Sequence, residues 1–257
     1  MVTSTRTFAQ CVGGLAGEFG GHHLPYITTM PKILGGSLER DTTVTAENPA
    51  PALSALLRTG SQAEHTAAEG SSFMSELLAG RINAAGYAHF LGLLRRVYEA
   101  LEDAARELRD DPLASAVIDP AIERLAALDA DIEHWGATVV ASPATDAYVA
   151  RIQQSTSWGG LFIAHHYTRY LGDLSGGQAI GRIITREFDL DGAGVAFYSF
   201  DAVPKPKLYK DAYRARLDAL PLGADERERI LAEVKAVFGL NGGIFAEMTT
   251  YLDQYGR

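Results

Sequence analysis

The sequence contains a single cysteine, Cys11, among 257 residues, which excludes an intrachain disulfide framework and a cysteine-rich metal site. No apolar run reaches the roughly 18 residues of a membrane span, so we expect no membrane anchor. The N-terminus lacks a charged segment followed by an apolar one, so we expect no secretory signal. Together these absences predict a protein of the reducing cytoplasm.

Positive charge is also scarce. The chain has 23 Lys and Arg residues against 32 Asp and Glu residues, which gives a formal net charge of −9. Because nucleic-acid binding relies on a basic surface, this balance predicts no nucleic-acid partner. The hydrophobic content of 47% is enough for a chain of this length to bury a full core.

Strand patterns are nearly missing, since only residues 195–200 resemble a strand. Helical periodicity begins near Pro51 and predicts an all-α fold, a single multi-helix domain of about eight helices over residues 51–257. Capping residues before proline, Asp119-Pro120 and Ser142-Pro143, each predict the start of a helix. Residues 1–50 are rich in glycine and lack a helical period, so we expect a flexible N-terminal extension.

A long predicted helix, residues 158–188, is interrupted by Gly172, Gly176 and Gly177. Each glycine costs a helix about 1 kcal/mol relative to alanine, so a functional or packing reason is expected. Gly172 and Gly176 are four residues apart and share a face that has no side chains, against which a flat ligand could lie. Asp173 is the lone acid in this opening. The pattern predicts a bent helix pressed onto a ligand, with one carboxylate nearby.

His65 differs from the other histidines because of its spacing. Arg58 lies seven residues before it and Glu69 four residues after it, so a continuous helix would place all three on one face. Glu69 could accept the second ring N–H of a metal-bound His65, and Arg58, about 10 Å along the axis, could reach the carboxylate edge of a porphyrin. The alternative is a solvated polar stripe with an incidental histidine. For the remaining histidines we expect structural or solvated roles: His22, His23, His89, His134, His165 and His166.

A basic cluster follows near residue 205, opposed within the segment only by Asp211. Its members are Lys205, Lys207, Lys210, Arg214 and Arg216. Lys210 and Arg214 are one helical turn apart, which suits a pair of carboxylates. The alternative is a solvated helix face.

Five segments resemble, in order, those of the haem oxygenases, most closely the soluble bacterial members. The first is residues 64–74 around His65, and the longest is residues 164–178 around Gly172. The others are residues 97–102, 209–214 and 238–241. The resemblance spans about residues 51–255 and does not cover the N-terminal extension.

The resemblance implies an all-α enzyme that degrades haem to biliverdin, carbon monoxide and ferrous iron. Haem is both substrate and cofactor, sandwiched between the His65 helix and the glycine-interrupted helix, and no separate metal is implied. The other requirements are O2 and electrons from a partner such as a ferredoxin or a flavoprotein reductase.

The same resemblance implies roles for individual residues. His65 is the axial iron ligand, oriented by Glu69. The haem propionates are held by Arg58, Tyr167, Lys210 and Arg214, although the family often has lysine where this chain has Arg58. Asp173 orders distal water with support from Tyr98 and Arg169, while Gly172 and Gly176 leave room for bound oxygen. Phe238 and Phe245 either wall the pocket or belong to the core.

Two alternatives use the same residues differently. A haem-binding carrier or sensor without turnover needs His65 and the cations but not Asp173. A related helical enzyme, such as a thiamine-degrading hydrolase, needs a cysteine nucleophile. Cys11 lies outside the predicted helical body, which counts against that second alternative.

Overall fold

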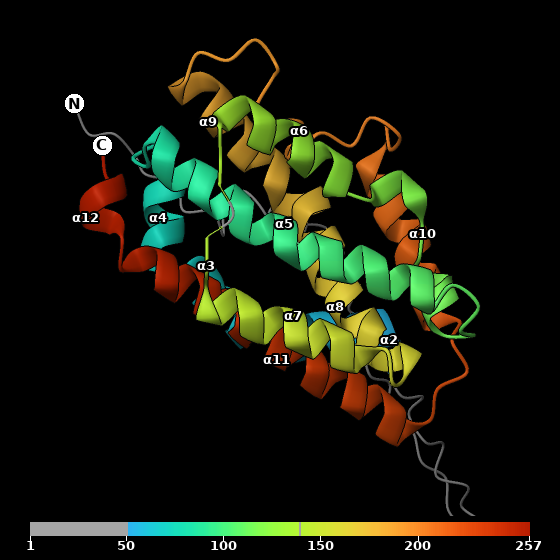
Figure 1. The fold of residues 1–257 in the computed structure, drawn as a ribbon. Helices are drawn as coiled ribbons and strands as arrows, with labels where there is room; N and C mark the ends of the chain where they lie inside the picture. Colours follow the sequence, from blue (N-terminus) through green and yellow to red (C-terminus); the bar gives the residue numbers. More distant parts are fainter. Residues whose placement is uncertain (1–50, 139) are drawn as a thin grey trace, which may run out of the picture. The chain divides into compact units, whose positions relative to one another are not determined.

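A computed structural model describes residues 51–138 and 140–257, and these residues are helical with no strand among them (Figure 1). The all-α prediction is therefore confirmed. No helix of the described part is both long and apolar enough to cross a membrane. The predicted extension, residues 1–50, lies outside the described residues.

Three short helices begin the described chain: α2 (Leu53–Gly60), α3 (Gln62–Glu69) and α4 (Ser72–Leu78). The chain leaves helical geometry at Ser61, where φ is −109° and ψ is 13°, and the Ser61 hydroxyl donates to the Leu57 carbonyl oxygen at 2.7 Å. The prediction that one continuous helix carries both Arg58 and His65 is therefore wrong. Such breaks also raise the number of helical segments above the predicted eight.

Among the described residues of the N-terminal half, α5 (Ala84–Glu107) is the longest helix, and it is buried along most of its length. It packs against α6 (Leu125–Trp135) and α7 (Pro143–Ser155), and α5 and α7 run side by side in Figure 1. The Asn83 side chain begins α5 by accepting from the Gly86 N–H at 2.9 Å. Among its fully buried side chains are Tyr87, Leu91 and Tyr98.

The two predicted helix starts differ in outcome. Ser142 caps α7 by accepting from the Thr145 N–H at 3.0 Å, with Pro143 as first helical residue, so that prediction is confirmed. Asp119 also caps the turn that begins at Pro120, by accepting from the Ala121 N–H. That element is only a 3₁₀ turn, η2 (Pro120–Ile122), and not an α-helix. A short 3₁₀ turn, η1 (Ala114–Ala116), precedes it.

The C-terminal half contains the glycine-interrupted helix and two helices that support it. The interrupted helix consists of α8 (Gly159–Gly172), a π-helical turn, η3 (Asp173–Gly177), and α9 (Gln178–Glu187). Helix α10 (Pro206–Asp218) packs against α2, and α11 (Ala224–Thr249) packs along α8, α7 and α3. The short α12 (Leu252–Tyr255) lies against α5. Because α3 and α8 both pack on α11, this helix sets their relative positions.

The prediction of a strand at residues 195–200 is wrong. The structure has a 3₁₀ turn there instead, η4 (Ala196–Tyr198). The Ala196 and Phe197 N–H groups each donate to the buried carboxylate of Asp131 at 2.8 Å, so a side chain supplies the acceptors that a neighbouring strand would provide. Alternation of apolar and polar residues cannot reveal such an acceptor.

Candidate functional site

The interrupted helix uses its glycines on two different faces. A Cβ added at Gly172 would meet no atom within 4 Å, so the backbone there is open. A Cβ at Gly177 or Gly181 would instead come within 3.0 or 2.9 Å of Tyr198. The first glycine leaves space beside the helix, and the other two let Tyr198 pack against its backbone. Gly176, which was expected to share the open face, is buried.

A π-helical turn lies where the glycines predicted a bend. A π turn inside an α-helix widens the backbone locally and is often found at functional sites. It begins at Asp173, directly after the open backbone of Gly172, and ends at Gly177. The turn therefore places the lone acid of the segment at the edge of the open region.

Asp173 lies in a buried polar cluster with Tyr98, Arg169 and Asn241. The Tyr98 hydroxyl donates to Asp173 Oδ2, and Arg169 Nη2 lies 3.6 Å from Asp173 Oδ1. Arg169 also donates to the Tyr98 hydroxyl at 3.2 Å and to Asn241 Oδ1 at 2.8 Å. The structure thus brings together three predicted residues and adds Asn241, for which the sequence predicts no role.

Burial dominates the electrostatics of this cluster. It raises the pKa of the Asp173 carboxyl, whereas the positive charge of Arg169 and the hydrogen bond from Tyr98 act in the opposite direction. Only 8% of Asp173 is exposed, so the carboxylate depends on these two partners rather than on bulk water. One carboxylate oxygen, Oδ2, is engaged by Tyr98, while Oδ1 has only the longer contact with Arg169. Oδ1 is therefore the atom better placed to accept a hydrogen bond from a water molecule.

His65 lies on α3 in contact with Glu69 and with Phe238 of α11. Its Nδ1 is 3.5 Å from Glu69 Oε2, beyond the usual hydrogen-bond length, and this buried nitrogen has no other partner. The rings of His65 and Phe238 meet edge to face with centroids 5.4 Å apart. Burial lowers the pKa of His65 and raises that of Glu69 to about 7. The pairing with Glu69 predicted from the spacing is present as a close contact, not as a formed hydrogen bond.

The three cations and one hydroxyl that are predicted to hold a pair of carboxylates come from three helices. Arg58 is on α2, Tyr167 is on α8, and Lys210 and Arg214 are on α10. Burial raises the pKa of the Tyr167 hydroxyl, and the positive charges of Arg214 and Arg58 oppose this shift. The break at Ser61 does not remove Arg58 from this group, because tertiary packing of α2 against α10 brings it there.

The two phenylalanines have separate environments on α11. Phe238 contacts His65, whereas Phe245 is partly buried against Phe90, with ring centroids 6.1 Å apart. Phe238 therefore adjoins the candidate ligand and Phe245 adjoins a core residue, and a pocket-wall role for either stays a prediction.

A family model of haem oxygenases matches residues 51–247. The chain belongs to the haem oxygenase family. Haem oxygenase 1 of Nostoc sp. is 36% identical over 199 residues, which cover 75% of this chain and 84% of that protein. The structure of haem oxygenase from Leptospira interrogans is 36% identical, with a TM-score of 0.73, and covers 77% of this chain and all of that one. Haem oxygenase-1 of Synechocystis, solved in complex with haem, is 33% identical with a TM-score of 0.75 over 79% of this chain and 95% of that chain.

Membership of the family establishes the activity expected from the motifs. The protein is an enzyme that binds haem and degrades it to biliverdin, carbon monoxide and ferrous iron, using O2 and electrons. The described residues fit this substrate on three counts. The backbone at Gly172 is open, Nδ1 of His65 faces Glu69 and so leaves Nε2 for a ligand, and the charges of Arg58 and Arg214 act on the Tyr167 hydroxyl.

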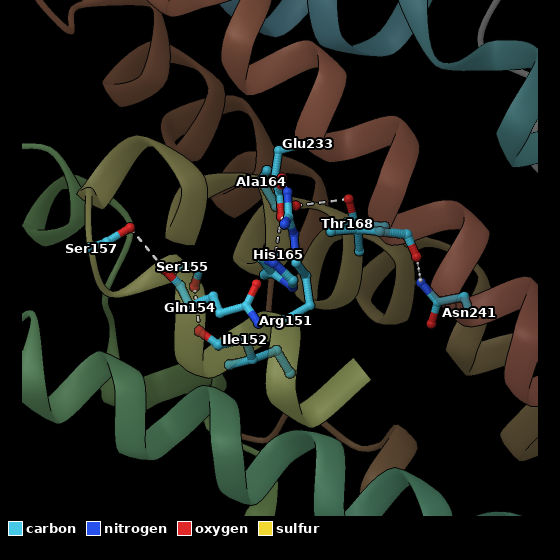
Figure 2. A network of polar contacts seen from close by, with 11 residues as sticks. Arg151, Ile152, Gln154, Ser155, Ser157, Ala164, His165, Thr168, Glu233 and Asn241 are labelled. Carbon is cyan, nitrogen blue, oxygen red and sulfur yellow. Dashed lines mark hydrogen bonds and ion pairs between the residues drawn. The ribbon is translucent and has the colours of Figure 1, made fainter. Parts of the chain in front are cut away.

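The adjacent histidines of α8 take structural roles in this enzyme, as expected. His166 Nδ1 lies 2.9 Å from the Tyr213 hydroxyl, and burial lowers the pKa of His166 to about 3. His165 Nε2 lies 3.0 Å from Glu233 Oε1, and Arg151 donates to both oxygens of the same carboxylate, as Figure 2 shows. Although burial opposes the charged form, these hydrogen bonds lower the pKa of Glu233 to about 2.

Two of the surface cavities among the described residues lie along α11. One, of 380 Å³, opens beside Arg151, Arg229 and Glu233 between α7 and α11. The other, of 460 Å³, lies between α3 and α11, and Phe238 and Gly242 are among its lining residues. Neither cavity is lined by Gly172, Asp173 or His65.

Proposed function

We propose that haem lies between α3 and the α8–η3–α9 segment, with His65 as the axial ligand of its iron. Three observations support this arrangement: Nδ1 of the partly exposed His65 faces Glu69 and so leaves Nε2 for a ligand, the Phe238 ring packs against the imidazole, and the backbone at Gly172 is open. Haem would supply the iron at which dioxygen reacts. Glu69 would orient His65 by closing the present 3.5 Å contact into a hydrogen bond.

Asp173 would hold the water that delivers protons on the distal side. Its Oδ2 is occupied by Tyr98, and its Oδ1 faces only Arg169 at 3.6 Å, so a water molecule can donate to Oδ1. Arg169 is held in turn by Asn241, which keeps the carboxylate from rotating away. The observation that carries this role is the position of the buried cluster directly after the open backbone of Gly172.

The propionates of haem would be held by the cations that surround Tyr167. A partly buried hydroxyl and the cations of α2 and α10 offer hydrogen-bond donors to a carboxylate, and of these cations Arg214 already has Asp211 as a partner at 3.1 Å. Lys210 adds an ammonium group from the same helix as Arg214. These contacts would fix which edge of the porphyrin faces Asp173.

Titration with haem followed by addition of a reductant tests the whole arrangement. An oxygenase loses its Soret absorbance as biliverdin and carbon monoxide appear, whereas a carrier or sensor keeps its spectrum through repeated reduction. Burial makes the Asp173 carboxylate costly to keep ionised. A haem carrier or sensor would not require this carboxylate, so its presence favours the oxygenase.

The basic segment is proposed to dock the electron donor, an acidic protein such as a ferredoxin or a flavoprotein reductase. Lys205 and Lys207 are exposed at the start of α10, and Leu208 between them and Lys210 is 59% exposed, which is unusual for a large apolar side chain. A cytoplasmic location, where such electron donors occur, stays a prediction of the sequence.

Electron transfer from an acidic donor should therefore slow about tenfold between low and high ionic strength, because salt screens charges that steer association. The Lys205→Ala/Lys207→Ala variant should lose most of this salt dependence, measured as the rate of haem reduction by the donor. The matched control is Arg81→Gln, which removes an exposed cation on the loop between α4 and α5. Rates that stay flat with salt in the unaltered protein would contradict the docking proposal.

Residues 1 to about 48 are proposed to be dispensable for catalysis, because they precede every matched motif and the region matched by the family model. A chain that begins at Asn48 should bind haem with the same dissociation constant and open it at the same rate as the full chain. Thermal unfolding of both chains provides the control for stability. A large loss of haem affinity or of melting temperature would show that the extension contributes to the helical body.

A further inference from the structure

Lys210 makes a contact that its role toward a propionate does not require. Its Nζ donates to the hydroxyl of Ser175 at 2.9 Å, although the two residues are on separate elements. Ser175 lies in the π turn η3, two residues after Asp173 and one before Gly176. The contact therefore joins the cationic end of α10 to the turn that carries the distal carboxylate.

The ammonium of Lys210 has little negative charge around it. Burial and the neighbouring charge of Arg214 lower its pKa, against the effect of Asp211. Asp211 is itself engaged by Lys207 and by Arg214, at 3.1 Å each. A serine hydroxyl orients an ammonium but does not neutralise it, and an ammonium has three donors, so Lys210 can hold Ser175 and an anion together.

Without Ser175 the direction of this side chain would be poorly determined. Lysine has a long and flexible stem, and fixing it on ligand binding costs conformational entropy. A hydrogen bond that exists before the ligand arrives removes part of that cost and selects the rotamers that point at η3. An anion bound by Lys210 is then held at a set position relative to the turn that carries Asp173.

We propose that Ser175 is a positioning residue that holds the Lys210 ammonium against the distal turn and so sets the in-plane orientation of bound haem. The inference rests on the proposed function, in which Lys210 holds a propionate. It goes beyond that function because a hydrogen bond between Ser175 and Lys210 links the position of the propionate to that of the distal turn. Ser175 then contributes to the choice of the porphyrin carbon that faces Asp173, without touching the reacting atoms.

The test is a double-mutant cycle between Ser175→Ala and Lys210→Met, read first by haem affinity. Removing one hydrogen bond at this partly exposed position should weaken haem binding about threefold. In the Lys210→Met background the same serine change should have no further effect, because its partner is gone. Ser175→Thr keeps a hydroxyl and should restore the affinity. The matched control is Ser157→Ala, which removes another exposed hydroxyl with a single hydrogen bond, to the Gln154 carbonyl oxygen.

Orientation is measured without turnover from the haem-methyl proton resonances of the ferric cyanide complex, where each in-plane orientation gives its own set. Ser175→Ala should populate a second set, and the biliverdin isomers formed on turnover should change in the same ratio. A single unchanged set of resonances, or an equal effect of Ser175→Ala with and without Lys210, would overturn the proposal. Failure of the unaltered protein to open haem would instead contradict the proposed function, and the affinity cycle would still report on the Ser175–Lys210 coupling.

Discussion

Replacement of Asp173 by alanine should lower the rate of haem ring opening by about 100-fold or more, the usual range for loss of a positioned proton-transfer group. The dissociation constant for haem should stay near that of the unaltered protein, because Asp173 is held by Tyr98 and Arg169 rather than by the ligand site. Biliverdin formation in single turnover measures the first quantity, and absorbance titration measures the second. Loss of the ordered water should also divert the reaction, seen as faster oxidation of an added phenolic dye.

Two further variants separate the causes of that loss. Asp173→Asn keeps the shape of the side chain but not its charge, so a rate near that of the alanine variant would assign the effect to the carboxylate. Asp191→Ala removes an exposed acid beyond the end of α9 and should leave rate and affinity unchanged. A rate and product yield near those of the unaltered protein in Asp173→Ala would contradict the proton-delivery role, and would leave the open backbone at Gly172 as the remaining distal feature.

Replacement of His65 by alanine should abolish ring opening and change the Soret spectrum. We expect the rate of ring opening to fall more than about 100-fold. Loss of a residue that only hydrogen-bonds to a metal ligand can cost up to about 100-fold, and His65 is the proposed ligand itself. The side chain of His65 is 36% exposed, so its removal should leave the helical circular dichroism intact. Added imidazole should restore the spectrum by occupying the space that the ring vacates, beside Phe238.

His134→Ala is the matched control, because His134 is exposed on α6 and should leave both readouts unchanged. The two histidines of α8 are poor candidates for the ligand, since His165 contacts Glu233 and His166 contacts Tyr213. A spectrum and rate like those of the unaltered protein in His65→Ala, combined with loss of both in a His165 or His166 variant, would reverse this assignment.

Local patterns in the sequence were enough to predict the class of fold and the main candidate residues. Helical periodicity and the near absence of strand patterns predicted an all-α chain, and glycines in a helix interior predicted an irregularity around Asp173, where the structure has a π turn. Both depend on local geometry, because backbone propensity and one-turn spacing act over a few residues. The serine before proline predicted the start of α7 for the same reason.

Tertiary structure alone decided which distant side chains meet and which local patterns fail. The strand-like residues 195–200 became a 3₁₀ turn because Asp131, far earlier in the chain, supplies the acceptors. Gly177 and Gly181 leave room for Tyr198 to pack against the helix backbone, and no spacing within the helix predicts this contact. The distal cluster needs Asn241 from α11, and the cation group needs α2 packed on α10. These outcomes depend on contacts between residues far apart in sequence, whose geometry is set by packing of whole helices rather than by local propensity.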